Sequence, residues 1–209
     1  MAPLHTIEVR WFPSERPFEV SRYFSAEHEA PERTDWYAVP SHDGSGVKIR
    51  EGRLETKLRS SVVGRHEFGD ATTGLIETWS KWSVELAADD APSELILESA
   101  GWLAVAKQRY VRRFEVRASE IWETLDRPLN GCSFELTKLT VYDRVYWTTG
   151  FEAVAFPSSD GSDDQLARNL HRIFERINSE TTLPRLTLGD SKGYPAWLNS
   201  PAINCIRRT

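Results

Sequence analysis

Apolar and polar residues alternate with a period of two along most of this chain, which is the pattern of half-buried β-strands. The segments with this alternation are 6–12, 35–39, 47–50, 53–59, 76–86, 103–116, 132–143, 145–147 and 151–156. Turn chemistry separates them, with Asn130-Gly131 the strongest hairpin signal and a further turn at 148–150. Many short strands with few helices favour a closed barrel or a strongly curved antiparallel sheet over βαβ units.

Helical spacing is clearest over residues 164–177, where apolar side chains recur on one face. The other segments outside the strands are expected to be loops at 14–34 and 60–74, helical turns at 18–24 and 119–125, a helix between a cap at Asp90 and a stop at Gly101, and a tail from Leu183 onward that wraps the surface. The chain is therefore predicted to be mainly β, with a few flanking helices.

Charged residues recur on one face of five of these strands, and apolar residues occupy the opposite face. The pairs that share a face are Glu8 and Arg10, Lys48 and Arg50, Lys57 and Arg59, Lys81 and Glu85, and Lys107 and Arg109. If the strands close into a barrel with helices packed outside, these charges line a solvated tunnel. If the charges instead face outward, the apolar rows form an ordinary core, and the pattern alone leaves both arrangements open.

The densest group of cations lies in residues 103–114, where lysine and arginine are interspersed among β-forming residues. Lys107, Arg109 and Arg113 fall on one face of the predicted strand, and Arg112 falls on the other. Adjacent cations repel one another, so a sheet tolerates them only where water, carboxylates or a bound anion compensates. An anion site is the functional interpretation, and a solvated outer face with ordinary cross-strand ion pairs is the alternative.

Composition narrows the class of protein. The 209 residues are 40% hydrophobic, enough for one substantial core, so we expect a single domain spanning 1–209. A formal net charge of -5 argues against a non-specific nucleic-acid binder. Cys132 and Cys205 are far apart and no Cys/His cluster has zinc spacing, which fits a reducing cytoplasm. No stretch approaches the run of about 20 apolar residues that a spanning helix needs, so a soluble cytoplasmic protein with no membrane partner is expected.

Eight tryptophans and five histidines suggest other classes of function. The tryptophans could serve a hydrophobic-ligand barrel or a protein-interaction module, but they are dispersed, and large aromatic residues usually belong to a core or its rim. The histidines are equally scattered, and no Ser/His/Asp or Cys/His arrangement supports nucleophilic catalysis.

Seven short motifs lie in order along nearly the whole chain, at 7–10, 35–37, 47–50, 54–59, 105–109, 141–152 and 191–198. The best match among them is Val105-Ala-Lys107-Gln-Arg109, a Val-x-Lys-x-Arg strand. Their order resembles the CYTH superfamily, the triphosphate tunnel metalloenzymes that include thiamine triphosphatases, inorganic triphosphatases and class IV adenylate cyclases.

The resemblance implies an α+β fold, mainly antiparallel β, in which a closed or nearly closed eight-stranded β-tunnel carries a few flanking helices. It also implies that tunnel cations bind triphosphate, thiamine triphosphate or a nucleotide. The candidate ligand-binding cations that lie in these motifs are Lys48, Arg50, Lys57, Arg59, Lys107 and Arg109. Lys81, on the charged face of the strand at 76–86, is the seventh candidate. Glu8 and Glu152 would hold Mg²⁺ or Mn²⁺. Fixed cations suit a polyphosphate and a hard divalent ion prefers carboxylate oxygen, so the implied activity is that of a metal-dependent phosphohydrolase.

The chain departs from this family at the implied metal site. The family's opening Glu-x-Glu-x-Lys motif keeps Glu8 here but has Arg10 and Phe12 at its other positions. Its late Glu-x-Glu pair keeps Glu152 but has Val154. Losing one carboxylate from each pair would weaken a Mg²⁺ site severely.

Two functions therefore stay open. One is a divalent-metal-dependent triphosphatase in which another acid compensates, the candidates being Glu77, Glu85, Glu135 and Asp143. The other is a catalytically inactive tunnel that binds an anionic ligand or serves as a protein-interaction module. The cationic strands support both functions, and the incomplete glutamate pairs favour the second.

Overall fold

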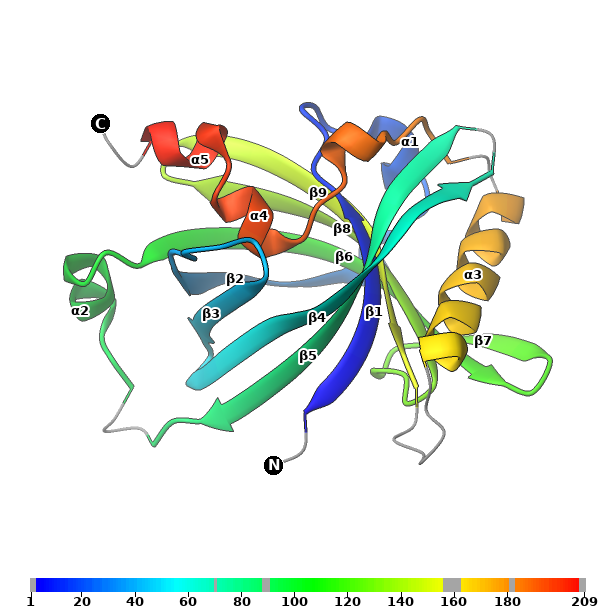
Figure 1. Ribbon diagram of the computed structural model, residues 1–209, viewed down its shortest axis with the longest axis horizontal. Coiled ribbons are helices and arrows are strands. Elements are labelled where there is room, and N and C mark those ends of the chain that lie inside the picture. The colour runs from blue at the N-terminus through cyan, green and yellow to red at the C-terminus, as the bar shows by residue number, and fades with distance from the viewer. Residues whose placement is uncertain (1–2, 70, 88–90, 156–162, 181–182, 207–209) are drawn as a thin grey trace.

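The computed structural model describes residues 3–69, 71–87, 91–155, 163–180 and 183–206. Strands dominate the described chain (Figure 1). They are β1 (Leu4–Trp11), β2 (Glu29–Ala38), β3 (Ser45–Arg50), β4 (Arg53–Phe68), β5 (Thr72–Glu85), β6 (Leu103–Arg117), β7 (Glu120–Thr124), β8 (Gly131–Val141) and β9 (Arg144–Val154). The helices are α1 (Phe18–Ser21), α2 (Glu94–Ser99), α3 (Asp163–Glu180), α4 (Tyr194–Leu198) and α5 (Pro201–Ile206), with 3₁₀ turns at Ala26–His28 and Leu188–Asp190.

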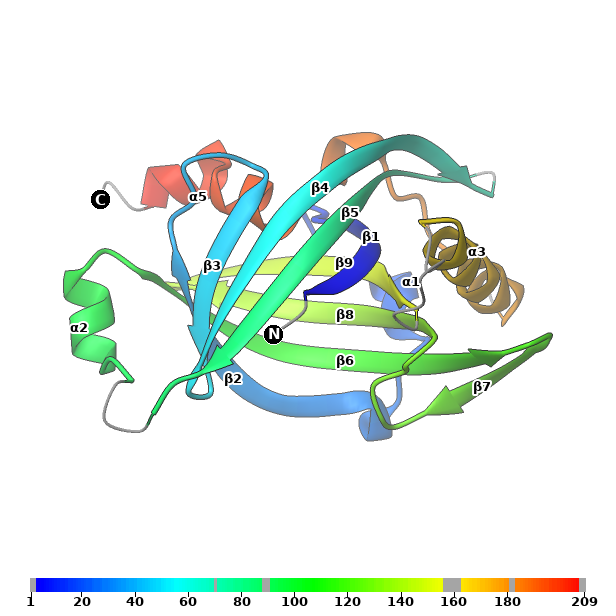
Figure 2. The same ribbon diagram turned by 60° about the horizontal axis from the view of Figure 1, so that its bottom comes forward.

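The strands form one sheet that closes on itself. Hydrogen-bonded neighbours follow the order β2-β3-β4-β5-β1-β9-β8-β6-β7, and an additional β2–β6 pairing joins the two sides. Eight strands thus complete a ring, and β7 extends it as the second strand of the β6 hairpin. The pairings between these strands are antiparallel, and Figure 2 shows β5, β1 and β9 side by side on one wall. The prediction of a closed eight-stranded antiparallel tunnel is confirmed.

The outer face of the sheet carries the larger apolar core. Ile7 and Trp11 of β1 pack there with Leu170 and Ile173 of α3, and all four side chains are buried. Helix α3 contacts β1, β8 and β9 and covers this part of the wall (Figure 1). The helix predicted at 164–177 is confirmed, since α3 spans Asp163–Glu180, and the apolar side chains of the predicted stripe are among its buried residues.

The tail of the chain fills one end of the tunnel interior. Val105 of β6 shares a face with Lys107 and so points inward, where it belongs to one apolar cluster with Trp197 of α4. The ring of Phe12 stacks on Trp197 with centroids 5.0 Å apart. The prediction that the tail from Leu183 wraps the surface is wrong for α4, because this helix places large buried side chains between the strands.

Three parts of the sheet were predicted as loops or as a helical turn, and all three are largely exposed to solvent. The sequence predicts a loop at 60–74, but β4 continues to Phe68 and pairs with β5 from Thr72 onward. Residues 60–67 are mostly exposed on both faces, so backbone pairing holds them as a strand without apolar alternation. The same reason applies to the first part of β2, predicted as a loop, and to the exposed strand β7, predicted as a helical turn.

Two glycines allow neighbouring strands to approach closely. A Cβ at Gly131, the first residue of β8, would lie 1.9 Å from the carbonyl oxygen of Phe114. A Cβ at Gly150, inside β9, would lie 2.6 Å from the carbonyl oxygen of Val9. The turn predicted at Asn130-Gly131 is displaced by a few residues, because the connection spans 125–130 and Gly131 already pairs in the sheet. The turn predicted at 148–150 is wrong, because Gly150 lies inside β9, where its neighbour leaves no room for a side chain.

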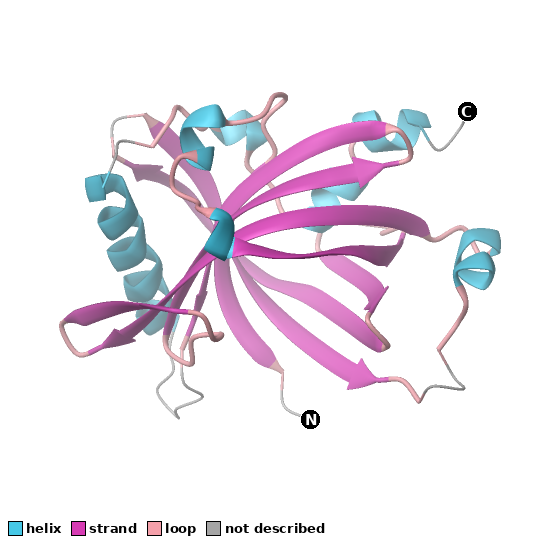
Figure 3. Cartoon of the chain, turned by 180° about the vertical axis from the view of Figure 1, so that it is seen from behind, coloured by secondary structure: helices cyan, strands magenta, loops and turns pink. Residues whose placement is uncertain are grey.

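Helix α2 lies beyond the ends of the strands (Figure 3). Ser93 caps α2, since its hydroxyl accepts a hydrogen bond from the backbone N–H of Ile96 at 3.4 Å. The cap predicted at Asp90 and the predicted strand end at Phe156 lie outside the described residues. None of the helices that the structure describes combines the length and the hydropathy needed to cross a membrane.

Candidate functional site

Charged residues of the inner face line a cavity of about 530 Å³ inside the ring of strands. This volume lies in the range of small-molecule sites, about 300–1,000 Å³. The cations in the lining are Arg10, Arg33, Lys48, Arg50, Lys57, Lys81, Lys107, Arg109, Arg113 and Arg127. The carboxylates in the lining are Glu8, Glu51, Glu55, Glu135 and Glu152. Of the two arrangements left open by the sequence, the structure has the one with these charges inside.

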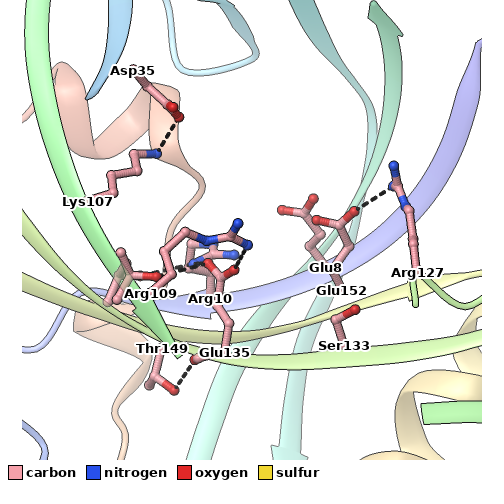
Figure 4. Close-up of polar contacts among 12 residues, drawn as sticks. Glu8, Arg10, Asp35, Lys107, Arg109, Arg127, Ser133, Glu135, Thr149 and Glu152 are labelled. Atoms are coloured by element: carbon pink, nitrogen blue, oxygen red, sulfur yellow. Dashed lines mark hydrogen bonds and ion pairs between the residues drawn. The ribbon is translucent and has the colours of Figure 1, made fainter. Parts of the chain in front are cut away.

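Asp35 of β2 holds three cations. Its buried carboxylate lies 2.9 Å from Arg33 Nε and 3.0 Å from Lys48 Nζ. It also lies 3.0 Å from Lys107 Nζ (Figure 4). Burial acts to raise the pKa of Asp35, but the three cations outweigh it and hold this pKa far below its usual range. Lys107 also donates to the Tyr37 hydroxyl at 2.6 Å. Burial lowers the pKa of Lys107 well below its usual value, and Lys48 acts in the same direction.

Glu135 of β8 binds two guanidinium groups. Its Oε1 accepts from Arg10 Nη1 at 2.6 Å, and its Oε2 accepts from Arg109 Nη2 at 2.5 Å (Figure 4). Burial acts to raise the pKa of Glu135, but the two arginines hold it well below its usual value. Arg10 is itself buried, and its Nε has no hydrogen-bond partner in the part of the chain that the structure describes.

Glu8 of β1 and Glu152 of β9 are cross-strand neighbours that share Lys81 of β5. Lys81 Nζ lies 3.1 Å from Glu8 Oε1 and 2.7 Å from Glu152 Oε1. Lys57 of β4 donates to both oxygens of Glu8, at 2.5 and 2.6 Å. Arg127 Nη2 lies 3.4 Å from Glu152 Oε1 (Figure 4). Burial acts to raise the pKa of Glu8, but the two lysines outweigh it and hold this pKa far below its usual range.

Lys57 and Lys81 share Glu8, yet their pKa values move in opposite directions. Burial and the repulsion from Lys81 lower the pKa of Lys57, and although Glu8 acts to raise it, the net result is a pKa of about 8. Lys81 is also buried, but Glu152 and Glu8 together outweigh burial and raise its pKa. The carboxylates therefore compensate Lys81 more fully than Lys57.

Lys48 and Arg50 also share a carboxylate, whereas Arg113 donates to a backbone carbonyl. Lys48 Nζ and Arg50 Nε lie 3.2 Å and 2.7 Å from the carboxylate of Glu55. Arg113 donates to the carbonyl oxygen of Leu125 at 3.2 Å. Burial lowers the pKa of Arg113, and the neighbouring cation Arg109 acts in the same direction.

The cavity brings together most of the predicted site residues. Its lining contains both predicted metal ligands and every predicted ligand-binding cation except Arg59. The register of β4 shifts after Arg59, and its Nη1 lies 2.5 Å from Glu77 Oε1. The predicted roles of these residues in binding a ligand stay predictions.

Some residues of the cavity were not predicted to belong to a site. Arg33 lies in a segment predicted as a loop, and Asp35 was noted only as part of a strand motif. In the longer strand observed, Arg33, Asp35 and Tyr37 alternate on the inner face, so the signal was present in the sequence. Tyr194 reaches the lining from α4, and no local pattern indicated that the tail enters the tunnel.

No protein-family model matches this sequence. A search of curated proteins likewise gives no match. Among solved structures, the chain is similar to a Bacillus halodurans protein provisionally named an adenylate cyclase, with 11% identity and a TM-score of 0.46 over 96% of this chain and 100% of that one.

The residues implied as metal ligands do not fit a divalent ion. Glu8 and Glu152 are ion-paired with lysines, and Glu135 is held by Arg10 and Arg109. Of the other acids considered as substitutes, Glu77 binds Arg59, whereas Glu85 and Asp143 are exposed. Within the described ranges, no group of three or more His, Cys, Asp and Glu side chains could hold a metal ion.

The positions that depart from the family's metal motifs have other partners in this fold. Arg10 pairs with Glu135, whereas Phe12 packs against Trp197 in the apolar end of the tunnel. Val154 is a buried residue of β9. The arginine at position 10 thus contributes to the charge network rather than leaving a gap in it.

Proposed function

We propose that the tunnel binds a polyanion of the triphosphate type directly through its lysines and arginines, without a divalent metal. The observation that carries this proposal is the sharing of carboxylates. Each of the following acids pairs with at least two cations: Glu8, Asp35, Glu55, Glu135 and Glu152. Cations outnumber carboxylates in this partly buried space, and an anionic ligand would balance them.

The charge of the cavity is opposite to that of the whole protein. The chain has a formal net charge of -5, whereas its cavity is lined mainly by lysine and arginine. A concave site lined by one sign of charge concentrates ligands of the opposite sign. The unpartnered Nε of Arg10 and the lowered pKa of Lys107 are local signs of the same imbalance. An anion in the cavity would stabilise the charged forms of both Arg10 and Lys107.

The order of motifs supports a triphosphate as the ligand class, because it resembles the CYTH superfamily. Inorganic triphosphate, thiamine triphosphate and a nucleoside triphosphate are the candidates. Guanidinium groups bind phosphate oxygens in bidentate fashion, and ammonium groups add point charges, so a mixed set of both suits a chain of phosphates.

Hydrolysis is not part of the proposal, because the acids that would hold a metal are bound by lysine and arginine. An apolar ligand is disfavoured by the charged lining. The tryptophans give no support to such a ligand, since Trp11 and Trp79 are fully buried and Trp197 packs in the apolar end of the tunnel.

Thermal unfolding with inorganic tripolyphosphate tests the proposal. A ligand that binds only the folded state stabilises it by mass action, so at about 100 times its dissociation constant we expect Tm to rise by roughly 5–10 °C. The rise should be the same when EDTA is present. The variant Lys107→Ala/Arg109→Ala should lose most of the rise in Tm. Its buried Asp35 carboxylate stays paired, because Arg33 and Lys48 remain as partners.

Arg65→Ala is the matched control, because Arg65 is an exposed cation on β4 whose ion pair with Glu67 lies outside the cavity. Its shift with tripolyphosphate should equal that of the wild type. A wild-type Tm that does not respond to tripolyphosphate, or an undiminished response in the double variant, would refute binding in the tunnel.

A further inference from the structure

Three glutamates lie in one row across the tunnel wall. The strand register places Glu8 of β1 opposite Glu77 of β5 on one side and opposite Glu152 of β9 on the other. Carboxylates in register repel each other, and each raises the cost of ionising its neighbour unless a cation lies close by. The row therefore requires cations, and the fold supplies them from β4 and β5.

Lys81 differs from the other cations of this row because it joins two of the glutamates. Its Nζ is within ion-pair distance of both Glu8 and Glu152, at 3.1 and 2.7 Å. Lys57 forms hydrogen bonds to both oxygens of Glu8 only. Arg59 binds Glu77 alone in this row. A single positive charge from β5 thus bridges the carboxylates of β1 and β9.

We infer that the ammonium of Lys81 is a built-in cation at the place where a divalent ion held by Glu8 and Glu152 would sit, and that removing it creates a divalent-metal site. Protein sites for hard divalent ions often use one or two carboxylates and complete their coordination with water. Without Lys81, two neighbouring carboxylates would share a cavity and lack their common cation. With Lys81 in place, a metal ion must displace a tethered charge that is always present at high local concentration.

The inference has a consequence for the natural protein. Its tunnel needs no dissociable metal to neutralise the Glu8–Glu152 pair, so the charge of the cavity does not depend on the supply of Mg²⁺ or Mn²⁺. This inference also stands apart from the proposed function, because it concerns a cation between two carboxylates and requires no bound polyanion.

Mn²⁺ binding to the full chain, measured from the loss of the free Mn²⁺ signal in electron paramagnetic resonance and with no phosphate present, tests the inference. Lys81→Met removes the charge and keeps much of the side-chain volume. We expect this variant to bind one Mn²⁺ about tenfold or more tightly than the wild type. The further change Glu152→Gln in the Lys81→Met background should return binding to the wild-type level.

Lys57→Met is the matched control, since it also removes an ammonium from Glu8 but leaves Lys81 between the two glutamates. It should bind Mn²⁺ no better than the wild type. If Lys81→Met does not fold, Lys81→Gln removes the same charge and carries the same expectation. The inference is overturned if a folded Lys81 variant gains no Mn²⁺ affinity, if Lys57→Met gains as much, or if the wild type already binds as tightly. A failure of tripolyphosphate to bind would leave this result unaffected.

Discussion

When one carboxylate pairs with two or three cations, it stabilises the charged forms of those cations unequally. The pKa values of the tunnel lysines reflect this difference. Lys81 has two glutamates and a raised pKa, whereas Lys57 has one shared glutamate and a pKa of about 8. Lys57 is therefore a cation of the cavity whose charge changes near neutral pH. Its titration should be visible in any property that depends on the charge of the cavity.

We predict that the affinity for tripolyphosphate falls as pH rises through about 8. Below this value Lys57 is protonated and attracts the anion, and above it the lysine is neutral and contributes no charge. Isothermal titration calorimetry between about pH 7 and pH 9 measures the effect, with Lys57→Met as the reference because the ligand's own titration is common to both proteins. An equal pH dependence in the two proteins would contradict the assignment to Lys57.

The sign for stability is opposite to that for binding. The pKa of Lys57 is lower in the folded state than the value of about 10.4 expected for an unfolded chain. Between these two values the unfolded chain binds more protons, so the contribution of Lys57 to the free energy of unfolding increases as pH rises.

Among the elements, β1 is the strand on which the site depends most, because it lies between β5 and β9 and carries Glu8 and Arg10. Its close contact with β9 requires a residue without a side chain at Gly150, which pairs with Arg10 in the register. A wider spacing here would shift Arg10 relative to Glu135 and Glu8 relative to Glu152. The geometry of the cavity is thus tied to one backbone contact.

We predict that Gly150→Ala destabilises the protein by about 1–3 kcal/mol, because the added Cβ meets the backbone of Val9. It should also weaken tripolyphosphate binding. Urea unfolding and calorimetry measure the two effects. Gly189→Ala is the control, since a Cβ there has ordinary van der Waals contact with the Thr187 hydroxyl at 3.7 Å, and its change should stay within about 0.5 kcal/mol. Equal stabilities for the two variants would contradict this role of Gly150.

Alternation along single strands predicted much of the tunnel. It placed Lys107 and Arg109 on one face and Arg112 on the other, and in the structure Arg112 lies outside and binds Glu123 and Glu180. The faces could be predicted because side chains alternate along a strand, so the face of each residue depends only on its position within that strand. The closed tunnel was predicted from the order of the motifs, which resembles the CYTH superfamily, because alternation alone left it open whether the charges face inward or outward.

Contacts between distant strands could not be predicted in the same way. The pairing of Lys81 with Glu8 and Glu152 depends on the register of three strands, and no segment of sequence contains that information. The hairpin formed by the ends of β4 and β5 was missed because exposure on both faces removes the apolar alternation. Arg59 binds Glu77 of β5 instead of lining the cavity, and this contact between two strands is likewise not visible in the sequence of β4 alone.

For the whole molecule, the main feature is a positive interior in an acidic protein. Salt should act differently on the exposed charges of the surface and on the cations of the cavity. Simple screening weakens interactions among the exposed charges, whereas a multivalent anion small enough to enter the cavity can also neutralise the cations there. Sulfate carries two charges on an oxygen framework similar to that of phosphate, so it suits this comparison.

We predict that sulfate raises Tm more than chloride does at equal ionic strength. Sulfate stabilises folded proteins in general because it is excluded from their surfaces. The rise in Tm that comes from the cavity is therefore the rise in the wild type minus the rise in Lys107→Ala/Arg109→Ala. That difference should be positive for sulfate and close to zero for chloride in calorimetric scans. The same sulfate response in both proteins would show that the anion acts only through general exclusion.

The apolar end of the tunnel depends on residues that follow every described strand in the sequence. Tyr194 completes the cavity wall, and Trp197 fills the space behind it. A chain that ended before α4 could still contain every described strand of the ring, but it would lack Tyr194 in the cavity wall and Trp197 in the apolar cluster. The shape of the cavity is therefore set by the last part of the chain as well as by the sheet.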